Sequence, residues 1–162
     1  MIVTHIGERL WPGYPSHGDS NEIKATGWMS SACLLVRRAA LDQIGLLDES
    51  YFIYGDEADL QYRLNKAGWK VVFLPNSSII HFGGRSMDRW KRRKMVYRGK
   101  MMFYKKNYGF FSTLLLRLMF FLMSLLKLLV WVVGYFIPSR NDQAKKELRS
   151  NIDVMGLCLN LK

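Results

Sequence analysis

The chain has 162 residues, 49% of them hydrophobic, and its 24 lysines and arginines outnumber 13 acidic residues to give a formal net charge of +11. This length suits one domain rather than two, and the hydrophobic content excludes wholesale disorder. The charge favours an anionic partner, namely nucleic acid, a phosphorylated substrate or an acidic membrane surface. Cys33 and Cys158 have neither metal-ligand spacing nor a disulfide framework, which favours a cytoplasmic setting.

The first part of the chain predicts a loop followed by a strand and a short helix. Residues 1–26 are rich in Gly, Pro and Ser and contain no apolar signal-peptide core. The apolar run from Trp28 to Arg38 predicts a buried strand, with Cys33 as a buried thiol. Residues 39–44 predict a short helix, which Gly45 is well placed to end.

Three carboxylates follow an aromatic run and open a predicted helix at 56–67. They are Asp56, Glu57 and Asp59, and the helix ends where Gly68 stands. A strand is expected from Lys70 to the residue before Pro75, and a second extended segment over 77–81. This alternation of strands and helices predicts an α/β arrangement.

The acidic turn and the histidine after it are candidate site residues. Acids in a first helical turn commonly just complement the helix dipole. Here an aromatic wall precedes them, and His81 is followed by Gly83 and Gly84, so a shared pocket is the functional alternative. The composition alone leaves His81 open as a metal ligand or as a structural residue.

The second half of the chain predicts a basic helix followed by an apolar helix and a polar tail. Residues 85–106 hold ten basic residues and one acid and predict a basic amphipathic helix. Residues 110–137 are long and apolar enough for a membrane helix, with Thr113, Arg117, Ser124, Lys127 and Tyr135 in one narrow polar stripe. Such a helix can span a bilayer or lie in its interface, with a buried soluble helix as the alternative. Pro138 is expected to end it, and residues 139–162 read as a polar tail.

Residues 27–84, GWMSSACLLVRRAALDQIGLLDESYFIYGDEADLQYRLNKAGWKVVFLPNSSIIHFGG, resemble the family 2 glycosyltransferases, particularly rhamnosyltransferase-like members. The resemblance implies the C-terminal half of a GT-A (Rossmann-like) α/β domain, followed by an amphipathic and hydrophobic helical segment. It divides the chain into a loop-rich remnant at 1–26, the acceptor-side half at 27–108, a membrane-associated helix at 109–138 and the tail at 139–162. The family's nucleotide pocket and Asp-x-Asp metal motif have no counterpart here, so the chain is expected to be incomplete and inactive alone.

The resemblance also implies roles for individual residues. Glu57 takes the place of the catalytic base that removes a proton from the acceptor hydroxyl, although Asp56 could serve instead because the order of the acids is swapped. Asp59 belongs to the same catalytic motif. His81 matches a histidine that joins the shell of a divalent metal, Mg²⁺ or Mn²⁺, in some members. Gly27 and Trp28 match the segment that borders the acceptor pocket, and Arg63 matches an arginine after the acidic helix. Arg63 and Arg85, the latter in the basic segment, are also expected to bind substrate.

The implied function is inverting transfer of a sugar from a nucleotide diphosphate-sugar donor to a hydroxyl of a cell-surface or lipid-linked glycan. The expected location is the cytoplasmic face of a membrane, with peripheral attachment or one hydrophobic segment. The alternative is a non-catalytic, membrane-anchored binding or assembly module derived from such an enzyme. Nucleic-acid binding through the basic segment is not expected, because an apolar segment stands beside it.

Overall fold

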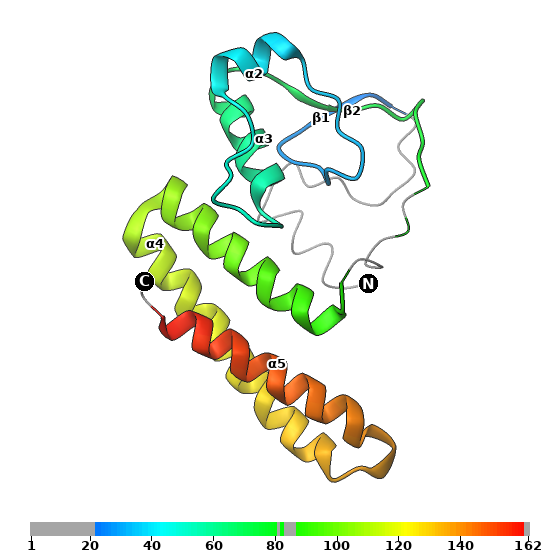
Figure 1. Ribbon diagram of the computed structural model, residues 1–162, viewed down its shortest axis with the longest axis vertical. Coiled ribbons are helices and arrows are strands. Elements are labelled where there is room, and N and C mark those ends of the chain that lie inside the picture. Colours follow the sequence, from blue (N-terminus) through cyan, green and yellow to red (C-terminus); the bar gives the residue numbers. More distant parts are fainter. Residues whose placement is uncertain (1–21, 81, 83–86, 161–162) are drawn as a thin grey trace. The chain divides into compact units, whose positions relative to one another are not determined.

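The computed structural model describes residues 22–80, 82 and 87–160, which form two compact units joined within the chain. The first unit comprises the described residues up to Phe52 and those from Asp56 to Phe82, and the second comprises Ile53–Gly55 and the described residues after Gly83. Figure 1 shows the elements of both. His81 and Arg85 lie outside the described residues.

The first unit combines two helices with a two-stranded sheet (Figure 1). Strand β1 (Lys24–Thr26) pairs antiparallel with β2 (Val71–Phe73), and Ala25 lies opposite Val72. Helices α2 (Arg38–Ile44) and α3 (Asp56–Lys66) stand between these strands in the chain. The described residues therefore contain helices and a small antiparallel sheet, which is consistent with part of an α/β fold.

A small hydrophobic core holds α2 against α3. Buried Ala40, Leu60 and Leu64 form its centre, and half-buried Leu34 and Trp69 are among the apolar residues that pack around them. The helix-period spacing of the two leucines on α3 explains why this face turns inward. The predicted helices at 39–44 and 56–67 are thus confirmed to within a residue, as is a strand between Lys70 and Pro75.

The predicted buried strand from Trp28 to Arg38 is wrong. Residues 28–37 have no regular secondary structure, and Leu35 is 96% exposed. Cys33, expected as a buried thiol, is also exposed. An apolar run becomes a strand only where a neighbouring strand satisfies its backbone groups, and within the described residues β1 and β2 pair only with each other. The extended segment expected at 77–81 has no regular secondary structure over its described residues 77–80.

The second unit is built from α4 (Arg89–Tyr135) and α5 (Asn141–Leu159), linked by the 3₁₀ turn η1 (Pro138–Arg140). Helix α4 begins at Asp88, whose carboxylate accepts a hydrogen bond from the Trp90 backbone N–H at 3.1 Å. It breaks at Gly109, whose φ of 78° lies in the left-handed region that favours glycine. The chain folds back there (Figure 1), so that the rings of Tyr97 and Phe120 lie 4.4 Å apart between centroids.

Helix α5 packs on both halves of α4. Its Val154 and Cys158 share a core with Met101 before the break and with Leu116 and Phe120 after it. An ion pair of 2.6 Å between Arg93 and Glu147 adds to this packing, with both side chains largely buried. The interpretation of residues 139–162 as a polar tail therefore missed a packed helix.

The apolar half of α4 is not a buried core helix. Helix α4 is long and apolar enough to cross a membrane by length and composition, and only 11% of its most apolar 18-residue window is buried within the described structure. Within the described residues the helix is therefore not wholly buried, and its association with a membrane stays a prediction.

Candidate active site

The acidic turn lies at the first turn of α3, directly after a tight reversal of the chain. Tyr54 and Gly55 both have positive φ, 62° and 109°. The carbonyl of Tyr54 packs within the second unit against Gly99 of α4, where an added Cβ would lie 1.9 Å from the carbonyl oxygen. Only a glycine permits this approach, so residue 99 has to be glycine for the Tyr54 carbonyl to pack there within the second unit.

The three acids differ in exposure. Asp56 and Glu57 are half-buried and within reach of solvent, whereas Asp59 has no exposed surface at all. A carboxylate that exchanges protons with a bound hydroxyl must be reachable by it. By exposure, the first two acids are therefore the candidates for chemistry.

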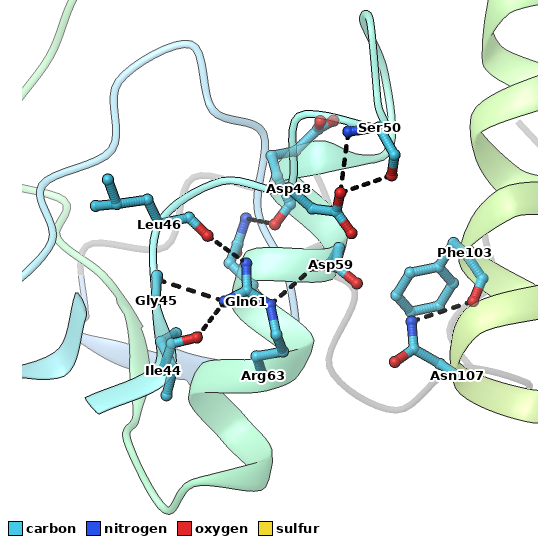
Figure 2. Close-up of polar contacts among 11 residues, drawn as sticks. Ile44, Gly45, Leu46, Asp48, Ser50, Asp59, Gln61, Arg63, Phe103 and Asn107 are labelled. Carbon is cyan, nitrogen blue, oxygen red and sulfur yellow. Dashed lines mark hydrogen bonds and ion pairs between the residues drawn. The ribbon is translucent and has the colours of Figure 1, made fainter. Parts of the chain in front are cut away.

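Asp59 forms an ion pair with Arg63 one helical turn later, at 2.9 Å (Figure 2). The same guanidinium donates hydrogen bonds to the backbone carbonyls of Ile44 at 2.6 Å and Leu46 at 2.8 Å. These carbonyls lie at the end of α2, where helical hydrogen bonding stops and acceptors need other partners. Arg63 therefore fastens α3 to the end of α2, and its expected contact with an acceptor stays a prediction.

The segment expected to border the acceptor is also fastened to α3. Gln61, fully buried, accepts a hydrogen bond from the Met29 N–H and donates one to the Met29 carbonyl, both at 2.8 Å. Asn65 donates to the Gly27 carbonyl at 2.8 Å. These bonds bring Gly27 and Trp28 alongside the helix that carries the acids. Sequence reasoning missed Gln61, because an amide on a helix gives no signal of a partner 32 positions away.

Tyr51 is a buried tyrosine close enough to Asp59 and Asp56 of the acidic turn to feel their charges. Its side chain is buried, and its hydroxyl has no hydrogen-bond partner in the described structure. Burial, followed by the negative charges of Asp59 and Asp48, raises the pKa of this hydroxyl well above its usual value. Asp48 in turn accepts hydrogen bonds from the backbone N–H and hydroxyl of Ser50 (Figure 2). Tyr51 is therefore neutral at every physiological pH.

The described residues do not complete a metal site. No group of three or more His, Cys, Asp and Glu side chains among them is placed to hold a metal ion. Asp56 and Glu57 offer the hard oxygen donors that Mg²⁺ and Mn²⁺ favour, but a third ligand would have to come from elsewhere. The metal role of His81 stays a prediction, because that residue lies outside the described part of the chain.

Comparison with known proteins shows the family to which the chain belongs. Residues 20–99, which contain α2, α3 and both strands, match the glycosyltransferase-like family 2. The chain belongs to the family 2 glycosyltransferases, as its motifs indicate. No solved structure matches the chain.

The relatives are named for glycan assembly. An N-acetylglucosaminyl-diphospho-decaprenol L-rhamnosyltransferase of Mycobacterium tuberculosis is 46% identical over 66 residues, which are 41% of this chain and 22% of the relative. An O-antigen biosynthesis protein of Myxococcus xanthus is 36% identical over 56 residues, or 33% of this chain and 4% of the relative. A low-salt glycan biosynthesis hexosyltransferase of Haloferax volcanii is 25% identical over 88 residues, 54% of this chain and 28% of the relative. The chain thus spans less than a third of each relative's length.

Proposed function

We propose that this chain forms the acceptor-side part of an inverting glycosyltransferase. The reaction would move a sugar from a nucleotide diphosphate-sugar to a hydroxyl of a cell-surface or lipid-linked glycan. The observation that carries the proposal is the sorting of three acids in the family segment. Two of them stay within reach of a substrate, while the third is locked in a buried ion pair.

Proton transfer is assigned to the accessible pair. Glu57 acts as the general base on the acceptor hydroxyl, and Asp56 is the alternative base. Asp59 was expected among the catalytic acids. Its burial and its bond to Arg63 support a positioning role, in which it holds the first turn of α3 in place for the two acids before it.

The acceptor side is assigned to the segment fastened along α3. Gly27 and Trp28 border the acceptor, and the hydrogen bonds of Gln61 and Asn65 keep them there. The name of the mycobacterial relative supports a lipid-linked acceptor and L-rhamnose as the first donor sugar to try. Arg85 would contact the acceptor's phosphates as part of the basic segment at 85–106.

We include a divalent metal in the proposal because of the family resemblance alone, since the described residues do not form a metal site. Bound Mg²⁺ or Mn²⁺ would neutralise the leaving diphosphate, with His81 as the expected ligand. Binding at the cytoplasmic face of a membrane is likewise proposed, and the exposed apolar surface of α4 supports it.

The test is sugar transfer by the intact protein in membranes of the cells that make it. Glu57→Gln should lower the rate of transfer by about 100-fold to 10,000-fold, because a general base contributes that much. Binding of the nucleotide-sugar donor should be unchanged in this variant. Glu49→Gln is the matched control, since Glu49 is an exposed acid of the same unit outside the acidic turn. Its rate should stay near that of the unaltered protein.

The outcomes separate the possibilities. Near-normal transfer by Glu57→Gln together with a large loss in Asp56→Asn would move the base to Asp56. Normal transfer by both variants would end the assignment of the acidic turn. No transfer from any nucleotide-sugar by the unaltered protein, with membrane binding retained, would favour the non-catalytic assembly module instead.

A further inference from the structure

The half of α4 after Gly109 has two different faces. One face is a stripe of exposed apolar residues, here called the apolar arc: Leu115, Leu118, Leu122, Leu126, Leu129 and Val133. They recur at the spacing of three and four that marks one side of a helix. The charged residues of this half, Arg117 and Lys127, point about 140° away from the centre of the arc at 100° per residue.

The opposite face of this half is covered by α5. Thr113, Leu116, Phe120 and Ser124 are buried there. The Arg117 guanidinium donates a hydrogen bond to the Asn160 carbonyl at 2.7 Å, just beyond the end of α5. Thr113 and Ser124 of the polar stripe are therefore covered by protein, and Arg117 has a backbone partner, whereas Lys127 and the apolar arc are exposed.

Helix α5 carries exposed charged residues outside the core that it shares with α4, and one of them, Lys146, lies 5.0 Å from the centroid of the Trp90 ring near the start of α4. Its exposed charged residues are Asp142, Lys145, Lys146, Arg149 and Asp153. They fall on one face at helical spacing, while the residues packed on α4 fall on the other. The apolar arc of α4 thus carries no charge, whereas the exposed face of α5 is rich in charge.

We propose that the apolar arc lies flat in the interface of an anionic bilayer and does not cross it. If the arc crossed, α5 would be carried alongside, and its five charges would enter hydrocarbon, where charged side chains are strongly disfavoured. Detaching α5 would instead break its ion pair with Arg93 and expose the shared core. Lying in the interface requires neither, because the apolar side meets acyl chains and the charged side meets water. This orientation rests on helix packing and needs no sugar transfer.

A cationic pocket at the start of the arc supports an anionic lipid as the partner. A cavity of about 270 Å³ opens beside the break in α4 and is lined by Lys105, Phe110, Thr113, Leu114 and Arg117. None of the described residues that line it is acidic. The Nε of Arg117 is buried without a hydrogen-bond partner in the described structure. Two cations beside apolar walls match a lipid phosphate with its acyl chains, and the net charge of +11 has the same sign.

The first experiment measures binding of the full chain to vesicles. Vesicles of phosphatidylglycerol and phosphatidylcholine should bind the chain, and pure phosphatidylcholine vesicles should bind it more weakly. Leu126→Asp should weaken binding about tenfold or more, because it places a charge in the arc. Ile152→Asp is the matched control, since Ile152 is a similarly exposed apolar residue on α5, 58% against 64%. Its binding should be unchanged, and Lys105→Gln should reduce the preference for the anionic vesicles.

The second experiment distinguishes lying from crossing. In a chain with Cys33→Ser and Cys158→Ala, single cysteines are placed at Ser112 and Ser139, on either end of the apolar half. A membrane-impermeant maleimide added outside the vesicles should label both positions. Labelling of only one position until detergent is added would show a spanning helix and overturn the inference. Absence of vesicle binding, or equal weakening by Leu126→Asp and Ile152→Asp, would overturn it as well.

Discussion

Replacing Arg63 by alanine tests whether the candidate site depends on the buried ion pair. Asp59 has no exposed surface, and its partner reaches it at 2.9 Å. Removing one member of a buried pair costs about 3–5 kcal/mol, because the other charge stays buried without compensation. The carbonyls at the end of α2 also lose their donors, but they lie closer to solvent, where water can replace the guanidinium. The free energy of opening for α2 and α3 should therefore fall by about 3 kcal/mol or more.

Hydrogen exchange followed by mass spectrometry measures this fall in the opening free energy separately for peptides of α2 and α3. A loss of about 3 kcal/mol corresponds to amide exchange more than about 100-fold faster in peptides from α2 and α3. Arg38→Ala is the control, since Arg38 also pairs with an aspartate one turn away at 2.8 Å, but its side chain is 83% exposed. Such a pair contributes only about 0.3–0.5 kcal/mol. Equal exchange in the two variants would refute the reasoning that burial gives the Arg63 pair its strength.

Four further changes test the packing within the two units. Gly99→Ala should destabilise the chain by about 1–3 kcal/mol in thermal unfolding, because the new methyl group overlaps the Tyr54 carbonyl. Gly156→Ala is the control: it has open space around it and should stabilise α5 by up to about 1 kcal/mol. Tyr51→Phe should be neutral or up to about 1 kcal/mol stabilising, since the buried hydroxyl lacks a partner. Folding raises the pKa of Tyr51 above 10.0, so the folded state keeps a proton that the unfolded state loses, and the free energy of unfolding falls as the pH rises past about 10. In urea titrations at alkaline pH, the phenylalanine variant should therefore lose less stability than the unaltered chain. Arg93→Ala should speed amide exchange in α5 by about 100-fold, because the carboxylate it pairs with remains buried; unchanged exchange would show that the pair does not hold α5.

Helix α3 could be predicted from sequence because its signals are local. Acids fill its first turn, leucines recur on one face, and Gly68 adopts a φ of 87° just after its end. The acidic turn was found for the same reason. Which of its acids is buried could not be found, because that depends on Arg63 reaching the end of α2 across 17 to 19 positions of the chain.

The misses arose where structure depends on distant partners. Residues 28–37 are apolar enough for a strand but pair with none of the described strands, while β1 has little apolar pattern and forms because β2 lies beside it. Helix α5 was overlooked because its composition is polar. Its signal was the spacing of Ala144, Val154 and Cys158, which places all three on the face that contacts α4. The polar stripe on the apolar helix was visible in the sequence, but the helix that covers it was not.

The break at Gly109 decides the dimensions of the second unit. A continuous helix of 47 residues would be a rod of about 70 Å, more than twice the thickness of a bilayer's hydrocarbon core. The left-handed backbone conformation of Gly109 instead folds the helix back, so that its basic first half packs against its apolar second half. Gly109 therefore shortens the second unit, and this folded form suits the proposed position in the membrane interface better than a continuous helix would.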